Sequence, residues 1–187
     1  MVFLTFVLTA TAPADALTVR EIEIVHFSHT MWVSPQKRFL EVPEIAEVKL
    51  DRANFQRLAK ARIDDAKALL DNQRWDGAYY LAGYAVECGL KSCIIAKLLA
   101  TDEFPEKSFS NNCWTHNLTQ LVSLAGLKDK LDADADVSLN WTLVKDWNET
   151  VRYDLKGASD AKSKAEDLYH AVTDSAHGVL LWIQMHW

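Results

Sequence analysis

The sequence predicts an all-α fold of about five helices, preceded by a short N-terminal arm or strand. The final helix is expected over about residues 160–185, where apolar residues recur at spacings of four, three, four, four, three and four. An earlier helix, over residues 74–99, has small residues at similar spacings. The chain of 187 residues is 49% hydrophobic and 25% charged, which suits one domain with one well-filled core.

The first part of the chain, residues 1–44, is predicted to be an extension of the helical domain. Residues 17–43 are rich in β-branched side chains and end in prolines, which favours a short strand or loose arm. Residues 2–10 are apolar, as in a signal peptide, but no Lys or Arg precedes Arg20. We interpret this segment as an N-terminal extension that results from a start codon assigned too early. Met31 is one candidate for the true start.

The helical domain, residues 45–187, is predicted to begin after Pro43. A first helix is expected over about residues 45–70, with its exit at Asp71-Asn72-Gln73. The helix over residues 74–99 follows almost at once, so these two helices should be antiparallel neighbours. Its small residues should line one face and admit another backbone closely: Ala78, Ala82, Ala85 and Gly89.

The second half of the domain is predicted to alternate loops and helices. Residues 101–112 are dense in turn residues and are expected to form the longest loop. A short helix follows from about His116 to Leu124, closed by Gly126. A further helical stretch runs over about residues 129–155, with a break near residues 134–138. Five tryptophans are expected to anchor the core or an interface: Trp75, Trp114, Trp141, Trp147 and Trp182.

The helix over residues 74–99 also carries a semi-polar ridge. Tyr80, Tyr84, Glu87 and Lys91 share one helical face, and the Glu87–Lys91 pair has the favoured acid-before-base order. One interpretation is a core helix with one solvated edge and a surface ion pair. The other is that these four residues line a cleft or an interface.

Three segments of the chain, taken together, resemble one protein family. The first is YYLAGYAVEC from Tyr79, followed by Leu90-Lys91. The second contains Thr115-His116-Asn117-Leu118, then Leu121, Ala125, Gly126 and Leu127. The third contains Trp141 and Trp147, then Arg152-Tyr153. In this order they are similar to the HEPN domains (higher eukaryotes and prokaryotes nucleotide-binding), over about residues 48–182.

The resemblance implies a compact antiparallel helical bundle that forms a homodimer. It also implies binding of RNA or a nucleotide and pairing with a small nucleotidyltransferase-type protein, as in toxin–antitoxin systems. On this basis Arg152 and Tyr153 are the expected RNA- or nucleotide-binding residues, since a guanidinium can clamp a phosphate with two hydrogen bonds.

The chain departs from the pattern of active HEPN ribonucleases, which place a His after the Arg with four to six residues between them. The positions after Arg152 that would hold it are Gly157, Ala158 and Ser159, none of which transfers a proton near neutral pH. The catalytic residues are therefore left unassigned. A substitute base, such as His116, His170 or Glu87, would be needed for cleavage.

Composition narrows the remaining possibilities. The net charge of −6 argues against nonspecific coating of nucleic acid, which depends on releasing many counterions. Three cysteines are too few for a disulfide scaffold and, as an odd number, favour a reducing, cytoplasmic location. No Gly-rich phosphate loop or Cys-x-x-Cys pair occurs, and we predict neither a metal nor a cofactor, and no membrane association.

Three functions therefore remain open. The first is an RNA- or nucleotide-binding HEPN protein without the usual ribonuclease pair. The second is a metal-independent endoribonuclease with a substituted base. The third is a non-catalytic helical interaction module that docks through the ridge.

Overall fold

The computed structural model describes residues 49–101, 104–153 and 158–187, and every regular element in this part is helical. The predicted all-α fold is therefore confirmed, while the predicted extension lies outside the described residues. The elements are α1 (Arg52–Asp71), α2 (Trp75–Thr101), α3 (Lys107–Asn112), α4 (Leu118–Leu124), α5 (Lys128–Ala133), α6 (Ala135–Val144), the 3₁₀ helix η1 (Glu149–Tyr153), α7 (Ala158–Thr173) and α8 (Val179–Gln184).

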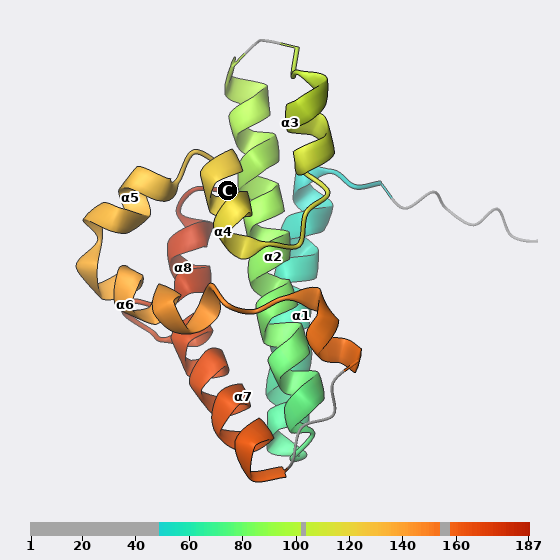
Figure 1. Cartoon of the computed structure of the whole chain (residues 1–187), viewed down its shortest axis with the longest axis vertical. Coiled ribbons are helices and arrows are strands. Elements are labelled where there is room, and N and C mark those ends of the chain that lie inside the picture. The colour runs from blue at the N-terminus through green and yellow to red at the C-terminus, as the bar shows by residue number, and fades with distance from the viewer. Residues whose placement is uncertain (1–48, 102–103, 154–157) are drawn as a thin grey trace, which may run out of the picture. The chain divides into compact units, whose positions relative to one another are not determined.

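Helices α1 and α2 form a hairpin that runs the length of the domain (Figure 1). The first helix begins at Arg52, later than expected, because the Asp51 side chain accepts a hydrogen bond from the Asn54 backbone N–H at 2.8 Å and so caps the helix there. The turn between the helices lies where the sequence predicted, and Gln73 takes a positive φ of 59° to make it.

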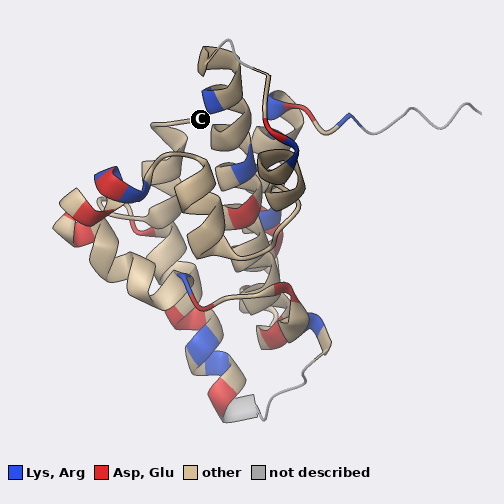
Figure 2. Cartoon of the chain, turned by 45° about the horizontal axis from the view of Figure 1, so that its top comes forward, with Lys and Arg blue, Asp and Glu red and all other residues tan. Residues whose placement is uncertain are grey.

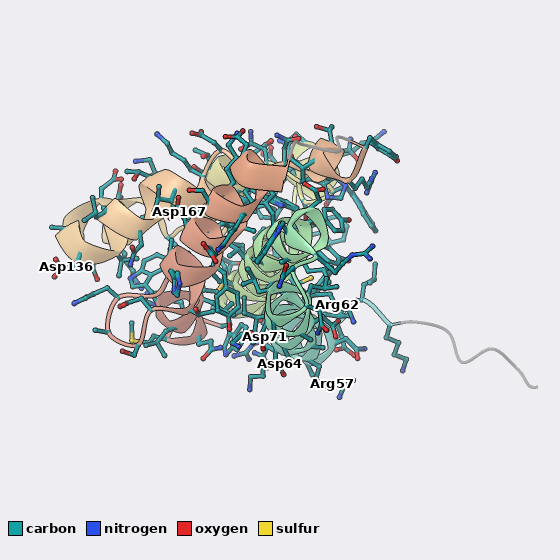
Figure 3. The ribbon with its side chains drawn as sticks, turned by 90° about the horizontal axis from the view of Figure 1, so that it is seen from below. Arg57, Arg62, Asp64, Asp71, Asp136 and Asp167 are labelled. Atoms are coloured by element: carbon teal, nitrogen blue, oxygen red, sulfur yellow. The ribbon has the colours of Figure 1, made fainter. Side chains whose placement is uncertain are left out.

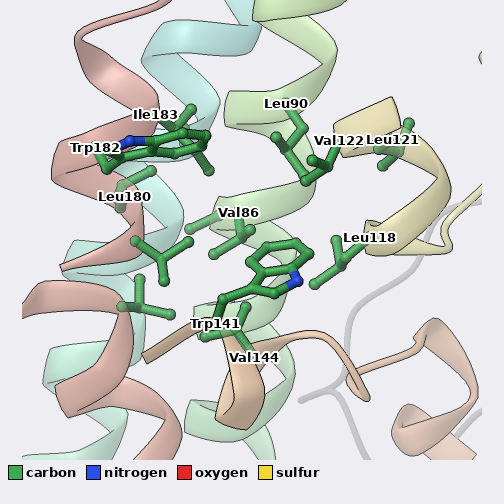
Figure 4. Close-up of a cluster of buried hydrophobic side chains, with 14 of the residues drawn as sticks. Val86, Leu90, Leu118, Leu121, Val122, Trp141, Val144, Leu180, Trp182 and Ile183 are labelled. Carbon is green, nitrogen blue, oxygen red and sulfur yellow. The ribbon is translucent and has the colours of Figure 1, made fainter. Parts of the chain in front are cut away.

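The core lies around α2. Its small residues Ala78, Ala82, Ala85 and Gly89 are buried, as predicted. An added Cβ at Gly89 would lie 3.0 Å from Cγ2 of Ile183, so α8 approaches α2 closely at this point. Figure 4 shows Val86 and Leu90 of α2 facing apolar side chains from α4, α6 and α8. These contacts bury one face of each helix and supply the main stabilisation of the fold.

The structure differs from the prediction in two segments of the second half of the domain. The loop expected over residues 101–112 contains α3, which the sequence did not reveal because this helix buries none of its residues. The stretch expected over residues 129–155 is three separate elements, α5, α6 and η1. Its break falls near the expected place, where the Asp134 side chain accepts from the Val137 backbone N–H at 3.1 Å and starts α6.

The prediction of one continuous helix over residues 160–185 is also wrong. This segment is divided into α7 and α8 by residues 174–178, and Ala176 of the predicted apolar stripe is exposed. The Asp174 side chain accepts hydrogen bonds from the backbone N–H groups of Ala176 (3.0 Å) and His177 (2.6 Å). This side chain competes with the helical pattern for the backbone, and the chain turns.

The tryptophans divide between core and surface. Trp141, Trp147 and Trp182 are buried, as predicted for core anchors, whereas Trp75 is half-buried. Trp114 is 69% exposed, so it is not a core anchor, and the alternative that it anchors an interface stays a prediction. It lies just after α3, in the segment that leads to α4.

Charged residues cover the outer surfaces of the described helices, and Figure 2 shows both signs along α7. There Lys162 and Glu166 form an exposed pair with Nζ and Oε1 3.7 Å apart. Among the described residues, no helix is both long enough and apolar enough to cross a bilayer.

Candidate functional site

The predicted ridge lies on α2, and its residues do not have a common environment. Tyr80 and Tyr84 are half-buried and their rings are stacked, with centroids 6.1 Å apart and an interplanar angle of 15°. Glu87 is only 1% exposed, and Lys91 is half-buried beside it. The interpretation of a solvated edge with a surface ion pair is therefore wrong. We keep the name α2 ridge for Tyr80, Tyr84, Glu87 and Lys91.

Arg152 meets the first tyrosine of the α2 ridge. Hydrogen bonding with Tyr80 and with Tyr153 raises the pKa of Arg152 above its ordinary value. The guanidinium carbon also lies 4.9 Å from the ring centroid of Tyr153. Arg152 is exposed and Tyr153 is 78% exposed, so a cation and an aromatic ring are presented together to solvent.

The buried Trp147 holds the segment that carries Arg152 against α2. Its ring lies 6.0 Å from that of Tyr80, and an added Cβ at Gly83 would be 2.3 Å from its Cγ. The absence of a side chain at Gly83 therefore provides the space that the indole occupies. Because η1 follows Trp147 by only a few residues, this packing brings Arg152 to Tyr80.

Glu87 joins α2 to the segment before α4. Its Oε1 accepts from Nζ of Lys91 at 2.8 Å, and both carboxylate oxygens lie 3.0 Å from Nδ1 of His116. His116 was expected to start the next helix, but Asn117 caps α4 instead by accepting from the Gln120 backbone N–H at 2.9 Å. Because Asn117 caps the helix, the imidazole of His116 is available to bind the buried carboxylate of Glu87.

Tyr84 and Cys88, four residues apart on α2, extend this polar row. Burial raises the pKa of Tyr84 to about 12, and burial also raises that of Cys88 to about 12. Neither group ionises near neutral pH, so they act here as neutral hydrogen-bonding groups and not as nucleophiles. The four-residue spacing of Tyr84 and Cys88 was the sequence signal for this extension, and it was missed.

Comparison with known proteins identifies the family. A family model described as HEPN domain matches residues 54–184, well over half of the chain. This chain belongs to the HEPN domain family. No curated protein and no solved structure matches it. HEPN domains are generally nucleotide- or RNA-related, and they often act in dimers or with partners.

In this HEPN domain the structure brings together residues that are far apart in sequence. Arg152 and Tyr153 meet the α2 ridge at Tyr80, and His116 meets it at Glu87. His170, the other histidine considered as a base, lies on α7 against the ring of Tyr169. Among the described residues, no hydrogen bond or ring contact joins His170 to the α2 ridge, and no group of three or more His, Cys, Asp or Glu side chains is arranged to hold a metal ion.

Proposed function

We propose that this HEPN-domain protein binds RNA or a nucleotide through Arg152 and Tyr153. The observation that carries the proposal is the exposed Arg152 guanidinium, whose carbon lies 4.9 Å from the centroid of the exposed Tyr153 ring. A guanidinium that is already oriented loses less side-chain entropy when it binds a phosphate. An exposed ring next to it suits stacking by a base.

The family also supports a proposal about partners. We propose a homodimer that works with a nucleotidyltransferase-type protein in a toxin–antitoxin-like pair, without the usual ribonuclease pair of Arg and His. The support is membership of the HEPN family, whose domains often act in dimers or with partners. Because the chain has a net charge of −6, ligand binding should depend on a local contact and not on an overall basic surface.

Substitution of Arg152 by alanine is expected to weaken binding of a short oligoribonucleotide by roughly tenfold or more, since a charge-assisted phosphate contact is lost. The measurement is a fluorescence or calorimetric titration at fixed salt. The matched control is Arg57→Ala, because Arg57 is an exposed arginine on the outside of α1 (Figure 3). Equal affinity of the Arg152→Ala variant and the wild type would rule out the assigned site.

A second candidate function, a metal-independent endoribonuclease, is favoured by the contact between His116 and Glu87. A carboxylate on Nδ1 orients an imidazole and leaves Nε2 as the proton acceptor. In this reaction the 2′-oxygen would attack phosphorus, its proton would pass to Nε2, and the bond from phosphorus to the 5′-oxygen would break, with a proton delivered to the leaving oxygen. The carboxylate-held His116 would replace the histidine that is missing after Arg152.

This second candidate predicts cleavage of RNA in the presence of EDTA, lost in a His116→Ala variant and kept in a His170→Ala variant. Gel analysis of the products and detection of a 2′,3′-cyclic phosphate end would measure it. If the wild-type protein leaves RNA intact, the protein is a binding HEPN domain only. If the His116→Ala variant cleaves as fast as the wild type, His116 is not the base and this candidate mechanism is wrong.

A further inference from the structure

Helix α6 has apolar side chains on its outer side as well as on its inner side. Val137, Trp141 and Val144 are buried, and Figure 4 shows Trp141 and Val144 among the core side chains. On the outer side, Leu139 and Leu143 are 71% and 52% exposed. These two leucines are four residues apart and therefore share one face of the helix. A helix that is apolar all round is normally buried all round, so the outer side of α6 has the composition of a contact surface.

Helix α7 shows how a solvated outer side is built in the same domain. Its exposed positions include Lys162 and Asp167, and Lys162 pairs with Glu166 (Figure 2). Helix α6 has only one charged residue, Asp136. A single exposed leucine is ordinary, whereas two on one helix face form an apolar patch of the kind that marks a contact with another protein.

Carboxylates lie at both ends of the leucine pair. Asp136 precedes Leu139 by three residues on the same face, its side chain is 72% exposed, and Figure 3 shows it at the outer edge of the molecule. Its Oδ2 lies 3.8 Å from Nδ1 of His177, which is too far for a hydrogen bond. Asp146 is also exposed and follows Leu143 by three residues, just beyond the end of α6. We call Asp136, Leu139, Leu143 and Asp146 the α6 outer face.

The surroundings of the α6 outer face are also acidic. Acidic residues outnumber lysines over residues 128–146, with Asp129, Asp132, Asp134, Asp136 and Asp146 against Lys128, Lys130 and Lys145. The lysines do not cancel this charge, and Lys128 is already paired with Asp132. A partner that places positive charge beside its own apolar residues would complement this surface.

A second copy of this chain does not complement it. In a two-fold contact the same face meets itself. Asp136 of one copy would then approach either Asp136 or Asp146 of the other, according to the direction in which the helices cross, and like charges repel in both arrangements. The homodimer proposed above should therefore use another surface.

We infer that the α6 outer face binds a basic amphipathic helix of a different protein. Apolar side chains of that helix pack on Leu139 and Leu143, and its Lys or Arg side chains lie beside Asp136 and Asp146. A helix is specified because two leucines four residues apart form the kind of ridge that packs against another helix. This inference rests on the proposed function for the existence of a partner protein, and not for the ligand site at Arg152.

The test is a fluorescence titration of the full chain with three synthetic peptides of about 15 residues, a length at which an isolated helix can form. The first contains Leu and Lys with the leucines on one helical face. The second has Glu in place of every Lys, and the third has the composition of the first in an order that scatters the leucines around the helix. Wild-type protein is expected to bind the first peptide at least roughly tenfold more tightly than either of the others.

Variants of the α6 outer face should separate its apolar and charged parts. The double variant Leu139→Ser with Leu143→Ser should bind the first peptide roughly tenfold more weakly, because the apolar contact is lost. Asp136→Asn with Asp146→Asn should bind it roughly fivefold more weakly at low salt, with a smaller difference at high salt, where exposed charges are screened. The matched control is Leu99→Ser, since Leu99 is 73% exposed at the end of α2, and it should bind as the wild type does.

The outcomes distinguish this inference from the proposed function. If the wild type binds all three peptides equally, or if Leu99→Ser weakens binding as much as the double leucine variant, the inference is wrong, and the titration with RNA still tests Arg152. Sedimentation velocity that shows a wild-type dimer and a monomeric double leucine variant would assign this face to a second copy and would also overturn the inference. Peptide binding as expected, with RNA binding absent, would overturn the Arg152 site alone.

Discussion

Substitution of Gly83 by alanine is expected to destabilise the protein by about 2 kcal/mol or more, although alanine is the better helix former. The added Cβ would lie 2.3 Å from Cγ and Cδ1 of Trp147, a distance that no pair of nonbonded carbon atoms can hold. The indole is buried in the core and cannot swing into solvent, so the clash must move α2 or the segment before η1. Thermal or urea unfolding would measure the loss.

The matched control for Gly83→Ala is Gly77→Ala in the same helix. An added Cβ at Gly77 would meet only the end of the Leu69 side chain, Cδ1, at 3.1 Å, which can give way. This variant should be within about 1 kcal/mol of the wild type. Trp147→Leu should itself destabilise strongly, but Gly83→Ala should cost much less in that background. A Gly83→Ala protein as stable as the Gly77→Ala protein would contradict the packing described for Trp147.

Removal of the Glu87 carboxylate is the second large expected effect. Glu87→Ala should lower the free energy of unfolding by about 3 kcal/mol, because it leaves the ammonium of Lys91 with 14% exposure and without its partner at 2.8 Å. It also removes the acceptor for His116 and releases the segment before α4 from α2. Chemical denaturation of the two proteins, side by side, measures the difference.

Two comparisons make the Glu87 prediction specific. Asp132→Ala breaks the Lys128–Asp132 pair, which has the same four-residue spacing but is exposed, and should cost roughly 0–1 kcal/mol. The double variant Glu87→Leu with Lys91→Met should recover most of the loss, since it replaces both charges by apolar groups of similar size. Similar losses for Glu87→Ala and Asp132→Ala would show that burial does not make the Glu87–Lys91 pair more important for stability than an exposed pair.

The sequence located most of the candidate site but not its connections. The spacing of Tyr80, Tyr84, Glu87 and Lys91 placed them on one face of α2, and the Arg-Tyr pair at Arg152 was identified separately. Whether these groups meet depends on how η1 folds back over α2, and no local pattern specifies that. His116 was considered only as one of several substitute bases, because its contact with Glu87 spans 29 positions of the sequence.

Helix continuity was the less predictable part of the fold. Apolar spacing suggested one helix over residues 160–185, since Ala176 fits the stripe as well as Ala165 does. The decisive residue is Asp174, whose carboxylate binds two backbone N–H groups and so ends the helical pattern. In the same way Asp134 separates α5 from α6, where the sequence suggested only a break within one stretch.

The sequence by itself determined that this chain is helical, which face of α2 is made of small residues, and that the HEPN family is the right comparison. These properties depend on residue spacing along single helices, which is local information. Only the tertiary structure decided that Glu87 is buried, that Gly83 receives the Trp147 ring, and that Arg152 and His116 both contact the α2 ridge. Burial and contact depend on which distant segment packs against a residue, and this is fixed when all the helices share one core.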